Sequence, residues 1–282
     1  MAPFLFALAS SVLYGSADFL GGWASRRGPV LAVTVLSQAM GLVVLLVAAL
    51  FAGGALRGDA LGWGVAAGLA GAVGVVLLYR ALAAGTVSAV APIISMIAIF
   101  VPVAVGLLSG ERPGPVALAG IALGAVAVTM IGAGEGGGGA RVFPTRAALA
   151  IAVTSGVFIG GFLVCIGRIP SGSGLWPLVV ARGAGTAALG LVLAARRGDA
   201  RVPRALWPAI AGCGAFDVSA NLLYWTAAQN GPLSLMATIV SLAPASTVVL
   251  AQLVLHERLA WLQKAGVAVA MAAIALLAYG MP

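Results

Sequence analysis

The sequence is poor in charged residues and in the side chains from which most catalytic and metal sites are built. Only 8% of its 282 residues are charged, two are cysteine and one is histidine. Soluble domains carry about a quarter charged residues, so this chain has too few polar groups to cover a soluble surface. Cys165 and Cys213 lie inside apolar segments, where neither is placed for a disulfide framework or a zinc site. His256 precedes Glu257, but residue 260 is alanine, so the H-E-x-x-H zinc motif is absent.

What the chain has in abundance is apolar sequence, since 62% of its residues are hydrophobic. A helix needs about 20 mostly apolar residues to cross the hydrocarbon core of a bilayer. Segments of this length can be placed ten times, at residues 3–24, 29–52, 60–84, 86–108, 115–133, 146–168, 173–195, 205–228, 231–254 and 261–280. We therefore expect an all-α membrane protein with ten transmembrane helices.

One stretch of the first half recurs in the second half. It runs from Leu77 to Arg112, and its second copy ends at Arg258. Both copies begin with Leu-Leu-Tyr, match at Ser95 and Ser241, and end in Glu-Arg. The offset is 145 residues at the tyrosines and 146 after a one-residue gap. The chain is therefore predicted to consist of two similar halves.

A glycine-rich run at residues 132–140 separates the fifth and sixth apolar segments. Such a run is typical of a flexible linker, and it lacks the Lys and Ser/Thr of a phosphate-binding Walker loop. The expected division is a first five-helix repeat at 1–134, a linker at 135–145 and a second five-helix repeat at 146–282. Because five is odd, the second repeat must enter the membrane the opposite way round. Inverted repeats are a transporter architecture, with the substrate bound in a central cavity between the halves.

The basic residues predict an orientation rather than a nucleic-acid partner. The net charge is +8, but most of the 15 Lys and Arg lie in short connections. Eleven follow odd-numbered segments, three follow even-numbered segments, and Arg182 lies inside a segment. Because cytoplasmic connections are enriched in Lys and Arg, this bias predicts cytoplasmic odd connections and both termini outside.

These features resemble a known family. The first segment carries Tyr14-Gly15-Ser16-Ala17-Asp18-Phe19, and each half has Ala-Pro, an apolar run, Glu-Arg and a final glycine-containing segment. The order is similar to that of two-repeat EamA-type transporters of the drug/metabolite transporter superfamily, over essentially the whole chain. The resemblance implies a bacterial inner-membrane carrier, usually an exporter of amino acids, other metabolites or drugs. One departure is that Pro244 aligns with Ala98, with Pro102 one turn on, so the halves are expected to kink differently.

Ionisable residues inside membrane segments are costly and usually face a cavity. Asp18 is such a residue, and Ser11, Tyr14 and Asp18 share one helix face at i, i+3 and i+7. The alternative is an Asp at the level of the lipid headgroups, close to Arg26 and Arg27. Both a proton- or substrate-binding role and this structural role remain open for Asp18.

A second polar stripe lies on the eighth segment, at Asp217, Asn221 and Tyr224. It could line a cavity, or it could form interhelical hydrogen bonds that need no transport role. Arg182 in the seventh segment could bind a substrate carboxylate, or it could neutralise Asp217 or Asp18. Gln38 occupies the corresponding place in the first half, so the charge is not duplicated.

The Glu-Arg pairs that close the two copies of the repeat, at Glu111 and Glu257, stand where a helix gives way to a turn. We interpret them as structural residues that form local ion pairs and helix caps. Glycine pairs four residues apart, such as Gly64/Gly68, allow close helix packing and say nothing about substrate.

Together these features predict a secondary transporter that moves a small organic solute (an amino acid, related metabolite or drug) across the bacterial inner membrane. We expect export by alternating access, coupled to protons through Asp18 or Asp217. The predicted cavity residues are Tyr14, Asp18, Gln38, Tyr79, Arg182, Asp217, Asn221 and Tyr224. No enzymatic activity, metal or cofactor is expected, the lipid bilayer is the other partner, and a monomer is compatible with the sequence. The alternatives are an uncoupled facilitator and, with less support, an intramembrane lipid-modifying enzyme.

Overall fold

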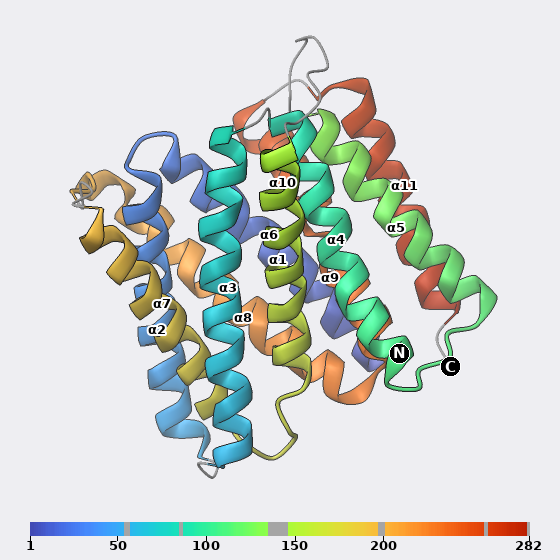
Figure 1. Cartoon of the computed structure of the whole chain (residues 1–282), viewed down its shortest axis with the longest axis horizontal. Helices are drawn as coiled ribbons and strands as arrows, with labels where there is room; N and C mark the ends of the chain where they lie inside the picture. The colour runs from blue at the N-terminus through green and yellow to red at the C-terminus, as the bar shows by residue number, and fades with distance from the viewer. Residues whose placement is uncertain (54–56, 85–86, 135–145, 197–200, 257–258, 281–282) are drawn as a thin grey trace.

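The computed structural model describes residues 1–53, 57–84, 87–134, 146–196, 201–256 and 259–280, with the side chains of 79 and 81–92 excluded (Figure 1). Within these ranges the secondary structure is entirely helical. The helices are α1 (Ala2–Ser25), α2 (Val30–Ala52), α3 (Gly58–Ala84), α4 (Val87–Leu108), α5 (Pro115–Gly134), α6 (Arg146–Gly167), α7 (Trp176–Ala195), η1 (Arg204–Leu206), α8 (Trp207–Asn230), α9 (Leu233–Val240), α10 (Ala243–Leu255) and α11 (Trp261–Tyr279). The predicted linker, residues 135–145, lies outside the described ranges.

Most of these helices have the length and composition of membrane spans. Within the described residues, eight candidate spans are long and apolar enough to cross a bilayer, with α9 and α10 counted together as one. The other two of the ten expected positions are occupied by α4, which is apolar over Ile93–Leu108, and by α8, which carries polar residues along one face. The chain is thus a multi-pass integral membrane protein with two five-helix repeats, as the sequence predicted.

The ninth span is broken, although the sequence predicted one apolar segment at 231–254. α9 ends at Val240, and α10 begins at Ala243 with a proline, Pro244, in its first turn. Proline has no N–H to donate to the carbonyl four residues earlier, and its ring collides with that carbonyl. The corresponding span of the first half, α4, runs unbroken through Ala98 and Pro102. The two halves therefore differ in shape at this span.

The packing of the helices follows the repeat. α1 packs on α8 as α6 packs on α3, and α2 packs on α8 as α7 packs on α3. α4 packs on α6, and its counterparts α9 and α10 pack on α1. Two further contacts join equivalent helices of the two halves, α5 with α11 and α2 with α7. These contacts map onto one another when the halves are exchanged, as expected for an inverted repeat, whereas α4 packs more closely on α5 than α10 does on α11.

Glycines bring several of these helices into backbone contact. A Cβ built on Gly64 would lie 2.3 Å from the carbonyl oxygen of Pro177, and one built on Gly68 would lie 2.2 Å from that of Ala181. Small residues at these positions let α3 and α7 approach closely, as the glycine spacing predicted.

The start of α1 and the end of α11 lie at the same end of the bundle (Figure 1). We call this end the terminal face; α4 ends there at Leu108 and α9 begins there at Leu233. The opposite end, which we call the linker face, is where α1 ends at Ser25 and α2 begins at Val30.

Candidate functional site

A cavity of about 510 Å³ lies between the two halves. Its walls come from α1, α2 and α3 of the first repeat and α6, α7 and α8 of the second. Cavities of about 300–1,000 Å³ suit small-molecule ligands. This cavity is therefore large enough to hold a small solute.

The cavity opens toward the linker face. Its lining reaches Ser25 and Val30 at that face, and Val30 is exposed. At the other end the lining side chains are buried, with Leu178 3% and Ile166 1% exposed. The cavity is therefore a pocket with a mouth on one side and a closed floor toward the terminal face.

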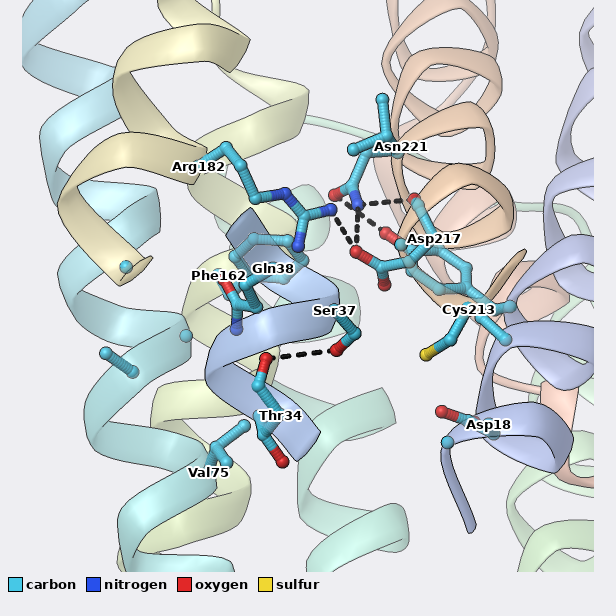
Figure 2. Close-up of a pocket in the computed structure, with 18 of the residues that line it drawn as sticks. Asp18, Thr34, Ser37, Gln38, Val75, Phe162, Arg182, Cys213, Asp217 and Asn221 are labelled. Carbon is cyan, nitrogen blue, oxygen red and sulfur yellow. Dashed lines mark hydrogen bonds and ion pairs between the residues drawn. The ribbon is translucent and has the colours of Figure 1, made fainter. Parts of the chain in front are cut away.

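An ion pair lies at the side of this cavity (Figure 2). The guanidinium of Arg182 on α7 donates to a carboxylate oxygen of Asp217 on α8. The two side chains are 10% and 28% exposed, so they face the cavity without being freely solvated. Of the two partners that the sequence left open for Arg182, this structure pairs it with Asp217.

The ion pair belongs to a network that joins three helices. The Asn221 side-chain amide donates to the carbonyl oxygen of Asp217 at 2.7 Å. The same amide nitrogen also lies 3.4 Å from the Asp217 carboxylate. The hydroxyl of Tyr14 on α1 donates to Oδ1 of Asn221 at 2.8 Å. Because each side chain orients the next, the network fixes both charges of the ion pair in the wall.

Asp18 lies in the same cavity but apart from this network (Figure 2). It is one helical turn beyond Tyr14 on α1, nearer the linker face, and it is exposed. Cys213, one turn before Asp217 on α8, also lines this outer part of the cavity. The two carboxylates therefore stand at different depths, one at the mouth and one near the floor.

The α2 wall adds polar groups that the sequence analysis identified only in part. Gln38 was predicted and lines the cavity, whereas Thr34 and Ser37 were not predicted and line it too. Ser37 donates a 3.0 Å hydrogen bond to the carbonyl of Thr34. The spacing of these three residues, i, i+3 and i+4, places them on one helix face and was the signal that could have revealed them.

The opposite wall is apolar. It is built by α3 and α6, with Val75, Leu78, Ile159 and Phe162 among its side chains. Phe162 packs over Gly71, where a Cβ would lie 3.2 Å from the ring. Phe162 was not predicted, because one aromatic in an apolar segment carries no distinguishing pattern. The cavity therefore has a charged side and an apolar side.

Two predicted cavity residues are not placed in the lining. Tyr224 is fully buried, and its hydroxyl donates a 2.9 Å hydrogen bond to the carbonyl of Leu163 on α6. It thus has the interhelical role that the sequence analysis left open for this stripe. The backbone of Tyr79 belongs to α3, but its side chain lies outside the described residues. Among the described side chains, no group of three or more His, Cys, Asp or Glu could hold a metal ion.

Comparison with known proteins identifies the family of this chain. The sequence profile of the EamA-like transporter family matches residues 1–133 and again residues 146–279. The chain belongs to the EamA-like transporter family. It is therefore a membrane transporter by family, with a small molecule as its class of substrate.

The fold of this EamA family member is also found among solved structures, of which 28 chains match. One of them, titled "Crystal structure of protein", aligns with a TM-score of 0.74 over 97% of this chain and 95% of its own length. Its sequence is 20% identical, so the likeness concerns the fold alone. No curated protein matches the chain in sequence.

Proposed function

We propose that this protein is a secondary carrier that exports a small organic solute bearing both a positive and a negative charge, such as an amino acid or a related metabolite. The observation that carries the proposal is the Arg182–Asp217 ion pair in the wall of a cavity with one open mouth. An arginine in a membrane protein binds carboxylates well, because its guanidinium is always charged and has several donors. A solute with both charges can therefore take part in two new ion pairs. Its carboxylate would bind Arg182, and its ammonium group would bind Asp217.

The shape of the cavity supports an apolar part in the same solute. The ion pair lies on the α7–α8 side, and the α3–α6 side presents Val75, Leu78 and Phe162. A solute with charges at one end and a hydrocarbon or aromatic group at the other would contact both walls. Small, strictly polar solutes would leave the apolar wall in contact with water, which lowers their affinity.

The open mouth agrees with export. The charge bias predicts that the linker face is cytoplasmic, and the cavity opens toward that face. A carrier in this state would load its substrate from the cytoplasm. We assign it to the bacterial inner membrane because its resemblance to the EamA-type transporters implies that location.

Proton coupling is assigned to Asp18 and Asp217, the two carboxylates of the cavity lining. Asp18 is exposed at the mouth, where it can exchange protons with water. Asp217 pairs with Arg182, and a substrate carboxylate that engages Arg182 would compete with Asp217 for the guanidinium. Substrate binding and proton uptake would thus be linked through one ion pair.

The test is transport by the purified protein in liposomes. First, a thermal-shift screen compares zwitterionic amino acids with organic cations; we expect zwitterions with apolar side chains to raise the melting temperature. Transport of the best ligand is then measured with and without a pH gradient. We expect the gradient to accelerate flux, and Asp18→Asn and Asp217→Asn to abolish that acceleration. Asp59→Asn, which removes an exposed carboxylate paired with Arg57, is the matched control and should transport normally.

Equal flux with and without the gradient would contradict the coupling and leave a facilitator. Flux that does not saturate with solute concentration would contradict the carrier mechanism as well. Thermal stabilisation by organic cations but not by zwitterions would contradict the assigned substrate class.

A further inference from the structure

Glu111 connects the two halves at the closed end of the cavity. It follows the end of α4 in the first repeat, and its carboxylate accepts three hydrogen bonds from the start of α9 in the second. Oε1 accepts from the backbone N–H of Leu233 at 2.6 Å. Oε2 accepts from the N–H of Ser234 at 3.0 Å and from its hydroxyl at 2.5 Å. A carboxylate at a helix N-terminus also interacts favourably with the helix dipole.

The backbone around Glu111 aims the carboxylate at α9. Gly110 adopts φ +93°, and its N–H bonds to the carbonyl of Leu107 at 3.1 Å. The N–H of Glu111 bonds to the carbonyl of Gly106 at 3.0 Å. This is the Schellman arrangement, which ends a helix with one left-handed residue, usually glycine. The turn therefore fixes the direction in which the backbone leaves α4. The Glu111 side chain starts from this fixed position and is not a mobile surface group.

Gly106 provides the space for this contact. A Cβ built on Gly106 would lie 2.5 Å from Oε2 of Glu111 and 3.1 Å from Cβ of Ser234. Any side chain at this position must push the carboxylate away from α9. The contact thus depends on three features: the left-handed backbone of Gly110, the absence of a side chain at Gly106, and the three donors at the start of α9.

The helix that Glu111 holds is part of the closed end. Every residue of α9 is buried, and α9 packs against α4 and α1. α1 in turn contributes Tyr14 and Asp18 to the cavity. For the cavity to open at the terminal face, the end of α4 and the start of α9 must separate or rotate, because they belong to different halves. That movement would break the three bonds of Glu111.

We propose that Glu111, with Leu233 and Ser234, is a latch that keeps the cavity shut at the terminal face while it is open at the linker face. The latch rests on the proposed transport cycle but adds a residue outside the substrate cavity that sets which face is open. Loss of the latch shifts the population toward a state open at the terminal face. In that state the outer part of the cavity, around Cys213, is closed.

The two native cysteines allow a test that uses no substrate. In a Cys165→Ala background, Cys213 remains as the single thiol and lines the cavity near its mouth. A second reporter is Ala228→Cys in a background without native cysteines; Ala228 is half-buried, and its Cβ is 3.5 Å from a Cβ built on Gly167 at the terminal-face end of α6. The rate of modification by a hydrophilic thiol reagent is measured for each reporter in nanodiscs. We expect Glu111→Gln to slow modification of Cys213 and to accelerate modification of the introduced thiol, each by about fivefold or more.

The opposite direction of the two changes separates a latch from a merely structural role, because loosening of the bundle would accelerate both. Gly106→Ala should act like Glu111→Gln, and Ser234→Ala should give a smaller shift in the same directions. These two variants decide the question if Glu111→Gln does not fold. Asp59→Asn is the matched control, since its carboxylate lies at the same face in an exposed pair with Arg57.

Unchanged rates, or acceleration at both reporters, in the latch variants would overturn the latch and leave the proposed transport function intact. If Cys213 is not modified in the unaltered background even at alkaline pH, where thiols react faster, the cavity has no open mouth, and the latch and the proposed function fail together.

Discussion

The hydroxyl of Tyr14 on α1 donates a 2.8 Å hydrogen bond to Oδ1 of Asn221 on α8, 207 residues away along the chain. The bond joins the first repeat to the second beside the candidate binding cavity. It also orients the Asn221 amide, which in turn donates to Asp217. The alignment of the charged side of the cavity thus depends on a contact between the halves.

Tyr14→Phe should weaken this contact. A net hydrogen bond contributes about 1 kcal/mol to stability, so we expect the melting temperature to fall by about 2 °C for a chain of this size. We also expect weaker binding of the best ligand, because Asn221 and Asp217 lose their orientation. Thermal unfolding in detergent, with and without ligand, measures both effects. Tyr279→Phe is the control, since Tyr279 is 83% exposed; equal effects of the two substitutions would contradict the prediction.

Breaking the Arg182–Asp217 pair should be more harmful than replacing it. Asp217→Ala leaves a half-buried guanidinium without its partner, and we expect the free energy of unfolding to fall by about 3 kcal/mol. Arg182→Met combined with Asp217→Leu removes both charges and should recover most of that loss. Transport should be absent from both variants. A double variant that still transports would show that the pair serves only the fold.

The exposed ion pair of Arg57 and Asp59 is the control for the Arg182–Asp217 variants. Its side chains are 52% and 53% exposed, and exposed ion pairs contribute about 0–1 kcal/mol. Arg57→Met combined with Asp59→Leu should therefore change unfolding and transport little. Thermal unfolding of all three variants, in the same detergent, gives the comparison.

Gly68→Ala should force α3 and α7 apart. The new Cβ would lie 2.2 Å from the carbonyl oxygen of Ala181, which is backbone and cannot rotate away. We expect a loss of about 1–3 kcal/mol, measured by thermal unfolding. Gly62→Ala, on the same helix with no atom within 4 Å of its built Cβ, should not destabilise the protein. Similar losses for the two variants would mean that helix composition, not helix contact, controls stability.

The orientation can be measured with fusions at the C-terminus. The charge bias predicts both termini outside the cytoplasm. A C-terminal alkaline phosphatase should therefore be active, and a C-terminal green fluorescent protein should be dark. Phosphatase inserted after Arg204, at the linker face, should be inactive. The reverse pattern would place the linker face outside, and the open mouth of the cavity would then receive solute from outside.

The positions of the spans were predictable because a helix that crosses a bilayer leaves a long apolar window. The expected segment 3–24 became Ala2–Ser25, and 261–280 became Trp261–Tyr279. The break between α9 and α10 was not predicted, since proline is tolerated inside apolar segments and no charge marks the site. Whether Pro244 breaks a helix or only bends it depends on the packing of neighbouring helices, which the sequence does not contain.

The candidate site was predictable where a polar residue stood out against an apolar helix. Tyr14, Asp18, Gln38, Arg182, Asp217 and Asn221 all line the cavity, and their roles in binding remain predictions. Tyr224 lies on the same face of α8 as Asp217, but the cavity does not extend as far along the helix as Tyr224. At that position the face of α8 packs against α6 instead. Glu111 was expected to cap locally, and its partners are more than 120 residues away. A contact of that range leaves no trace in the spacing of residues.

The unequal fourth and ninth spans have a consequence for energetics. In a perfectly symmetric carrier, the two halves could exchange their shapes. The exchange would convert the state open to one side of the membrane into the state open to the other side, with no change in free energy. Here one half carries an unbroken α4 and the other a break before Pro244, so the two halves cannot simply exchange shapes. The protein without solute would then favour the state that is open to one side of the membrane. Its resting side would be a property of the chain itself, present before any solute or gradient acts on it.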